Sequence, residues 1–351
     1  MKMKTSRALA VAGVLAASMT LGACSGGGDT APSAGDASTS SWADVEAAAE
    51  QEGQVTVYLA SQDAVNQALV AGFEAEYPNI DVNFVRLDSG PMSARIASEV
   101  QAGSTTADVV MMADNVQLEA NPEWYRDITS LPSYGDVPED RRVSDHYVIT
   151  QTAPFVITYN TDKIEKSDLP KTWKELAASP ILANSLLIDP RVASSFMAVD
   201  YFISQNDGEE VLKAYGEKSK GLSQGAAPGV QQVIAGEADA LFPNVREHTD
   251  AAREQGAHVE TTVPTPTIST VNLWALPEAA QAPNAGAVFM NYAMSKAGLA
   301  ATCLKGTYQP VAYSDIPDCP QEAPGTTRVL DIYPKLTDDV KADILALLGL
   351  Q

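Results

Sequence analysis

The sequence predicts an α/β fold built as two lobes, and three observations support this. Segments of strand character alternate with segments of helix character from residue 55 onward. The alternation starts again near residue 154. The chain after residue 41 holds about 310 residues, which exceeds the usual size of a single hydrophobic core.

The first lobe is expected to contain a parallel sheet. The predicted strands are 55–60, 80–87 and 107–113. Apolar side chains recur at helical spacing between these strands, first at Val65, Leu69 and Phe73 and then at Ile96 and Val100. Strands and helices that alternate at such short spacing indicate parallel strands joined by helices.

The second lobe is expected to repeat this plan. The predicted strands are 154–159, 185–188 and 238–242, and the predicted helices are 173–177, 196–203, 209–215 and 230–235. A further strand at 269–276 and helices at 285–304 and 338–348 complete the predicted elements.

The first 23 residues are typical of an export signal. Lys2, Lys4 and Arg7 are positively charged, and residues 8–21 carry no charge. This uncharged run is shorter than the roughly 20 residues that a membrane-spanning helix needs. It ends in Leu-Gly-Ala before Cys24, which resembles the lipobox of bacterial lipoproteins, so we expect cleavage before Cys24 and lipid attached to its thiol.

Residues 24–44 are expected to form a flexible tether that holds the folded part at the outer face of the membrane. They are mostly Ser, Gly, Ala, Asp and Thr up to residue 41, and such a composition offers little to bury. No later segment is long and apolar enough to be expected to span a bilayer.

The charge of the chain narrows the choice of partners. The formal net charge is −22 and becomes about −25 without the three positive side chains of residues 1–23. Such acidity argues against nucleic acid or anionic lipid as a partner.

With Cys24 assigned to lipid, Cys303 and Cys319 remain. We expect them to form a disulfide, because disulfides persist in oxidising compartments outside the cytoplasm.

Several segments in order resemble the ferric-iron-binding-like branch of the extracellular solute-binding proteins of ABC importers. That branch includes binders of iron, phosphorylated sugars, phosphonates, thiamine and polyamines. The matching segments are VTVY at 55–58, SQ at 61–62, AGFEAEYP at 71–78, ADVVMMAD at 107–114, ITYN at 157–160, PKTWKEL at 170–176, IAGEAD at 234–239 and KGTYQPV at 305–311.

The resemblance implies a type II periplasmic-binding-protein fold, in which two lobes close on a ligand about two hinge strands. The hinges would lie near 148–154 and 265–270. The first lobe would comprise 45–150 and 268–300, and the second 151–267 and 301–351. The resemblance further implies a monomer that binds a small molecule, catalyses no reaction, needs no cofactor and delivers its ligand to permease subunits in the membrane.

Ligands of open α/β sheets bind where strands end and helices begin. The polar side chains at the predicted strand ends are therefore the candidate ligand-binding residues. They are Ser61, Gln62, Ser89, Asp114, Asp189, Ser194, Ser195, Asn244 and Arg246. Each Ser or Asp could instead cap a helix.

An anionic ligand is favoured over iron. Ferric-binding relatives hold the metal with two adjacent tyrosines after the Gly-Glu-x-Asp strand, but this chain has Asn244 and Arg246 in that region. A guanidinium repels a cation and matches phosphate or carboxylate oxygens. We therefore predict a phosphorylated or otherwise anionic solute and no metal. His248 and Glu247 could bind iron in principle, although a lone His here is expected to be exposed.

Two other classes of protein compete with this interpretation. Residues 221–225 match the G-x-S-x-G pattern of exported hydrolases, but the preceding segment 215–220 is polar where a nucleophile elbow needs an apolar strand, so a loop is expected. The same scaffold could also serve a sensor or an adhesin.

Overall fold

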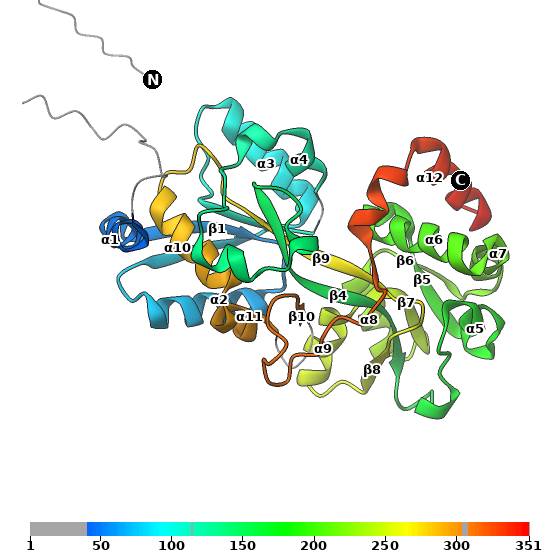
Figure 1. The fold of residues 1–351 in the computed structure, drawn as a ribbon. Helices are drawn as coiled ribbons and strands as arrows, with labels where there is room; N and C mark the ends of the chain where they lie inside the picture. The colour runs from blue at the N-terminus through cyan, green and yellow to red at the C-terminus, as the bar shows by residue number, and fades with distance from the viewer. Residues whose placement is uncertain (1–40, 114, 304–307, 351) are drawn as a thin grey trace, which may run out of the picture. The chain divides into compact units, whose positions relative to one another are not determined.

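The computed structural model describes residues 41–113, 115–303 and 308–350, and these form two lobes joined by shared strands (Figure 1). One sheet runs through both lobes in the order β2-β1-β3-β9-β4-β7-β5-β6. Cys24 and the predicted signal and tether up to residue 40 lie outside the described residues, as does Asp114. Among the described helices, none has both the length and the apolar character needed to cross a bilayer.

The first lobe contains parallel strands β1, β2 and β3, as the sequence predicts. β1 pairs with both neighbours in parallel, and β3 pairs with β9 in antiparallel orientation. The elements are α1 (Trp42–Glu52), β1 (Gln54–Leu59), α2 (Asp63–Glu76), β2 (Asp81–Arg86), α3 (Ser89–Gln101), β3 (Val109–Met112), α4 (Val116–Ala120), α10 (Pro283–Met294) and α11 (Lys296–Cys303).

The second lobe contains a second parallel set, in which β5 pairs with β6 and β7. The elements are α5 (Trp173–Ala178), β5 (Ser185–Ile188), α6 (Ser194–Asp207), α7 (Glu209–Lys218), β6 (Gly221–Ser223), α8 (Ala226–Ile234), β7 (Ala240–Val245), α9 (Arg246–Glu254), β8 (Val259–Thr262) and α12 (Asp338–Leu347). β5 has the bounds that the sequence predicts.

Strands β4 (Tyr147–Asn160) and β9 (Ile268–Ala275) pass between the lobes (Figure 1). They pair in antiparallel orientation, with a register shift between Ile149 and Gln151. Both predicted hinges fall on these strands or at their ends. Two short strands lie alongside them, since β10 (Gln309–Pro310) pairs with β4 and β11 (Thr327–Arg328) pairs with β9.

Each lobe has its own hydrophobic core. The second-lobe core includes Phe155, Trp173, Phe242 and, from the end of the chain, Ile344. The first-lobe sheet is covered on both faces, by a cluster around Phe73 on one side and by a cluster around Met92 and Ile96 on the other. This double covering explains why residues 107–113 read as a continuous apolar run.

The strand predicted to begin at residue 107 begins two residues further along the chain, at Val109. The preceding residue, Asp108, uses its side chain to bond other segments of the first lobe. The carboxylate of Asp108 accepts hydrogen bonds from the backbone N–H groups of Thr56, Gln281 and Ala282, at 2.8 to 2.9 Å. Asp108 thereby ties β1 to the start of α10. Buried backbone N–H groups need such partners.

The single helix predicted at 285–304 is two helices. α10 ends before Ser295, whose backbone is extended and whose hydroxyl accepts the N–H of Gly298 at 3.2 Å in the manner of a helix cap. α11 packs against α2, so the predicted lobe boundary at residue 300 falls inside a first-lobe helix.

Two further expectations were wrong in detail. Residues 42–44, predicted to belong to the tether, form the first turn of α1, because Ser41 and Asp44 cap this helix reciprocally. Residues 221–223, predicted to be part of a loop, form strand β6, which extends the parallel sheet next to β5.

Candidate ligand-binding site

A pocket of about 580 Å³ lies where the two lobes face each other. The first-lobe residues on its wall lie at the starts of α2 and α3, among them Ser61, Gln62 and Ser89, and at the ends of β2 and β3. The second-lobe residues come from the starts of α6, α8 and α9. Thr270 and Asn272 of the shared strand β9 complete this wall between the lobes. The pocket has the size expected of a small-molecule site.

Helix N-termini surround this pocket. The N-cap residues of α2, α3, α6 and α8 are Gln62, Asp88, Ala193 and Gly225, and all four line the pocket. Among the described side chains, none of these four residues caps its helix by a hydrogen bond. The first N–H groups of a helix need acceptors and carry partial positive charge. Their convergence favours an anion.

Helices that start elsewhere show the contrast. α1, α5 and α12 are capped by the hydroxyls of Ser41, Thr172 and Thr337. α4, α7 and α10 also start without a side-chain cap, at Asn115, Gly208 and Ala282. A missing cap is therefore common in this fold, and what distinguishes the pocket is that four such helix starts meet there.

Side chains of the two lobes touch inside the pocket. The Nε2 amide of Gln62 lies 3.3 Å from the Nε2 of His248 on α9. Next to this pair, the hydroxyl of Ser61 lies 3.3 Å from that of Tyr308, which in turn hydrogen-bonds the carboxylate of Glu247. Gln62 thus contacts His248 directly, and its neighbour Ser61 is linked to Glu247 through Tyr308.

Arg86 brings a positive charge to the pocket from the last position of β2. Its side chain is 36% exposed, and its guanidinium contacts the carboxylate of Asp88 at 2.6 Å. Since Asp88 is 68% exposed, water screens this pair and the guanidinium remains accessible to a ligand.

Burial shifts the pKa values of the groups around Arg86. Burial lowers the pKa of His248, with a smaller contribution in the same direction from Arg86 and an opposing one from Asp88. The imidazole is therefore neutral near pH 7 and can accept the Gln62 amide N–H. Burial also raises the pKa of Glu247, and it raises the pKa of Tyr308 well above its ordinary value.

Five of the residues predicted from the sequence line the pocket. They are Ser61, Gln62, Ser89, Ser194 and Ser195. Ser89 also accepts the backbone N–H of Ala113 at 3.0 Å, which joins the start of α3 to the end of β3.

Three predicted residues are not among the described residues that line it. Arg246 donates to Asp250 at 3.0 Å, one turn along its own helix. Asp189 accepts from the side chain and backbone of Arg191. Asn244 is buried and donates to Thr158 and Thr249. Each of these side chains serves a local contact.

Several residues of the pocket were not predicted from the sequence, including Arg86, Asn272 and Tyr308. His248, expected to be exposed, is half-buried in the pocket wall. Arg86 could have been identified because it lies at the end of a predicted strand. Tyr308 could not be identified in this way, because it comes after helix α11 and not after a strand.

The described residues contain no group of three or more His, Cys, Asp and Glu side chains arranged to hold a metal ion. Ser223 of the G-x-S-x-G segment is buried, and its hydroxyl donates to the carbonyl of Gly225 at 2.8 Å. A hydroxyl held in this way closes a turn and is not presented to a substrate.

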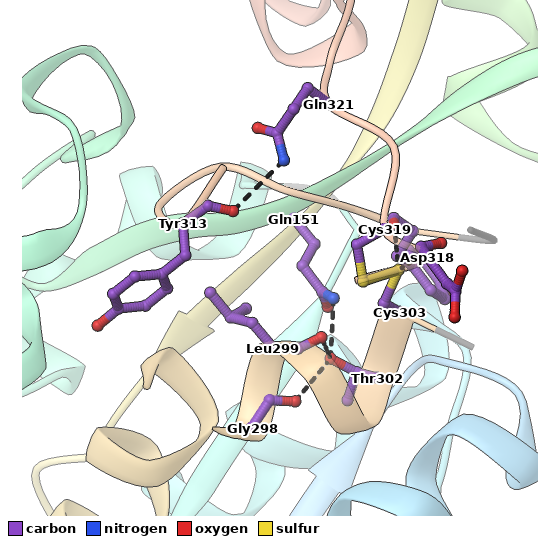
Figure 2. The surroundings of a disulfide bond; sticks show 10 residues. Gln151, Gly298, Leu299, Thr302, Cys303, Tyr313, Asp318, Cys319 and Gln321 are labelled. Carbon is purple, nitrogen blue, oxygen red and sulfur yellow. Dashed lines mark hydrogen bonds between the residues drawn. A yellow bond between two sulfur atoms is a disulfide. The ribbon is translucent and has the colours of Figure 1, made fainter. Parts of the chain in front are cut away.

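Cys303 and Cys319 form a disulfide (Figure 2). The Sγ of Cys303 lies 3.2 Å from the carbonyl oxygen of Tyr308, a residue that lines the pocket. Figure 2 shows the disulfide joining the end of α11 to the segment that returns past β4. Gln151 of β4 donates to Thr302, next to Cys303, at 2.8 Å. The disulfide therefore lies beside one of the strands that connect the lobes.

Comparison with known proteins gives a family match. Residues 56–300 match the family described as bacterial extracellular solute-binding protein. No curated protein matches the chain in sequence.

Solved structures show the same fold. One is the substrate binding protein of an ABC transporter from Agrobacterium tumefaciens, with a TM-score of 0.70 and 17% identity, covering 84% of this chain and 93% of that one. A second is iron-bound HitA from Pseudomonas aeruginosa, with a TM-score of 0.63 and 18% identity, covering 84% of this chain and 98% of that one. A third is AfuA from Actinobacillus pleuropneumoniae with exogenous fructose-6-phosphate bound. It has a TM-score of 0.63 and 16% identity, covering 86% of this chain and 100% of that one.

Proposed function

Because the chain belongs to the family of bacterial extracellular solute-binding proteins, we propose that it captures a small anionic solute for an ABC importer. Its fold is the type II periplasmic-binding-protein fold. The solute would be bound in the pocket between the lobes, and the closed form would be recognised by permease subunits. The protein would act by binding and closure, as a monomer and without catalysis.

The convergence of uncapped helix N-termini on one pocket carries the anion proposal. Backbone N–H groups at the starts of α2, α3, α6 and α8 would donate to the oxygens of a phosphate, phosphonate or carboxylate. Ser89, Ser194 and Ser195 add hydroxyl donors at the same positions. Arg86 supplies the guanidinium that the sequence analysis expected from Arg246.

The pocket also offers acceptors for the rest of the ligand. The carboxylate of Asp88 and the amide-bearing side chain of Asn272 belong to residues of its wall. These groups suit hydroxyl or amine donors. A phosphorylated or phosphonate-like solute that also bears such donors therefore fits the pocket better than a bare inorganic anion.

Iron(III) is the second candidate, because Glu247, His248 and Tyr308 lie together on the pocket wall and are all donor types that iron accepts. Two observations weigh against it. Burial holds the pKa of Tyr308 well above its ordinary value, which disfavours the phenolate that would bind the metal. Arg86 lies in the same pocket and repels a cation.

Lipid attachment at Cys24 would hold the protein at the outer face of the cell membrane. The support is the order of positive charge, apolar run, small residues and cysteine in the first 24 residues. A ligand captured there would be released close to the permease.

A thermal-shift screen followed by calorimetry tests the ligand class. We expect fructose 6-phosphate or another organophosphate or phosphonate to raise the melting temperature, and the matched unphosphorylated compound to have no effect. Thiamine, a polyamine and Fe(III) with citrate form the other arms of the screen. Binding of Fe(III) together with indifference to every phosphorylated compound would refute the anion proposal.

A further inference from the structure

Tyr308 lies within the loop that the Cys303–Cys319 disulfide closes. Its ring is 2% exposed and packs with Val65 of α2 and Ala153 of β4. It therefore lies between a first-lobe helix and a strand shared by both lobes.

The disulfide contacts Tyr308 through the backbone. The N–H of Tyr308 donates to the carbonyl of Cys303 at 3.3 Å, and the Sγ of Cys303 lies 3.2 Å from the carbonyl oxygen of Tyr308. The next residue, Gln309, pairs with Thr152 of β4. Tyr308 is thus held on one side by the disulfide and on the other by the sheet.

The hydroxyl of Tyr308 links the lobes. Ser61, from the start of α2, donates to it, and it donates to Glu247 on α9. All three residues line the pocket. A displacement of the Tyr308 backbone would break this chain of hydrogen bonds at its centre.

We propose that the Cys303–Cys319 disulfide is a positioning device for the pocket. It holds Tyr308 where its hydroxyl connects Ser61 of the first lobe to Glu247 of the second, and it thereby favours the closed arrangement of the lobes. Tyr308 and the disulfide are positioning residues here. The role in closure stands on these contacts, and its effect on ligand affinity rests on the proposed function.

A double-mutant cycle separates this role from simple loop stabilisation. The variants are Tyr308→Phe, Cys303→Ala with Cys319→Ala, and all three changes together. Hydrogen exchange of the purified, ligand-free protein is measured in peptides that cover 61–66 and 247–250. We expect the hydroxyl deletion and the disulfide deletion each to raise exchange there several-fold, and the triple variant to show no further rise.

Tyr313→Phe is the matched control. Tyr313 belongs to the same disulfide-closed loop, but its hydroxyl donates to Asp136 at 2.8 Å, away from the pocket. Exchange at 61–66 and 247–250 should be unchanged in this variant. The proposal is overturned if removing the disulfide raises exchange only within 308–319, or if its effect adds to that of Tyr308→Phe.

A second route is available if the alanine variant does not fold. Dithiothreitol reduces the disulfide of the folded protein by two-electron exchange, in which two protein thiols form and the reagent closes to its own cyclic disulfide. Reduction should raise exchange in the same two peptides in the native protein and not in Tyr308→Phe. Equal effects in both proteins would contradict the proposal.

The ligand arm uses fructose 6-phosphate as the probe. If the native protein binds it, both deletions should weaken binding by a similar factor, about three- to tenfold, without adding. If the native protein does not bind it or any other anion, the proposed function fails, and the exchange cycle still decides the role of the disulfide.

Discussion

The side-chain amide of Gln62 donates to the Nε2 of His248 across the pocket, over 3.3 Å. One residue precedes α2 in the first lobe, and the other lies in the first turn of α9 in the second lobe. The bond requires a neutral imidazole, because a protonated one has no acceptor. The lobe contact should therefore depend on pH.

We expect acid to weaken this contact. Burial lowers the pKa of His248 in the folded protein below its ordinary value, near 6.5. Just below that pH the unfolded chain binds more protons than the folded one, so the stabilisation is present above about pH 6.5 and is lost as the pH falls through the folded pKa. The loss should be on the order of 1 kcal/mol.

Thermal unfolding at pH values between about 7.5 and 5.5 measures this loss of stability. The native protein should lose stability more steeply on acidification than His248→Gln, in which no group titrates at this position. Parallel curves for the native protein and His248→Gln would show that the Gln62 contact does not depend on protonation.

Arg86→Ala should weaken binding of an anionic ligand by about ten- to a hundredfold, because hydrogen bonds to charged groups contribute about 1.5–3 kcal/mol. Calorimetry with a phosphorylated probe measures the change. Arg95→Ala is the matched control, since Arg95 bonds Glu99 and lies over the ring of Tyr58, outside the described pocket wall.

Arg246→Ala tests the competing assignment from sequence. We expect this change to lower the stability of the fold, because Asp250 loses a partner. The affinity for an anionic ligand should change by no more than about twofold. Loss of affinity in Arg246→Ala with retention in Arg86→Ala would restore the hypothesis based on sequence.

Asp200→Asn should stabilise the protein at neutral pH. Asp200 is fully buried in α6, and neither carboxylate oxygen has a hydrogen-bond partner among the described residues. Burial raises its pKa well above the ordinary value, with a smaller contribution from Asp189. Stability conferred by the protonated form is complete at low pH and is lost as the pH rises from about 4 through the folded pKa.

Denaturant unfolding at pH 7 and at pH 4 checks this prediction. The gain should be at least about 1 kcal/mol at pH 7 and should shrink at pH 4, because moving a pKa by one unit corresponds to about 1.4 kcal/mol. Asp343→Asn, at an exposed position of α12, should change little at either pH. A gain that does not depend on pH would mean that Asp200 does not titrate in this way.

Asn244→Ala should destabilise the protein without weakening ligand binding. The Asn244 amide donates to Thr158 at 2.7 Å and to Thr249 at 3.2 Å, and these hydroxyls bond each other at 2.7 Å. Removing the amide leaves buried hydroxyls with fewer partners, which costs about 1–3 kcal/mol. Asn206→Ala, at an exposed position, is the control for unfolding. A selective loss of affinity would return Asn244 to the ligand-binding set.

Cys24→Ala should abolish lipid attachment. Cells grown with a clickable fatty acid should label the native protein and not this variant, and the variant should leave the membrane fraction. Ser25→Ala keeps the cysteine and should label normally. Label retained in Cys24→Ala would place the lipid elsewhere and refute the lipobox assignment.

Strands that are buried on both faces were predictable because such burial leaves apolar runs, as at β5, whose four residues are all buried. The partly exposed strands β6 and β8 lack such runs and were not predicted. Once these strands were located, the helix starts near their ends could be predicted as well. Ser61, Gln62, Ser194 and Ser195 were identified as candidate site residues in this way. Patterns within a short stretch of sequence are therefore enough to locate buried strands and the helix starts that follow them.

The partners of charged side chains were not predictable. Arg86 is the last residue of β2 and Arg246 directly follows β7, and only the folded structure shows that Arg246 bonds Asp250 of its own helix. At the start of α9, Glu247 accepts the N–H of its own backbone. His248 and Tyr308 reach the pocket through contacts between residues far apart in sequence.

The interleaving of the lobes along the chain constrains how the protein acquires its structure. The first-lobe core includes Phe289 of α10, and the second-lobe core includes Ile344 of α12. α12 packs against α6 and α7, which precede it by more than a hundred residues. Neither core can therefore be completed while only the first half of the chain has been synthesised. A chain that stays unfolded until its last helices are made remains competent for passage through an export channel.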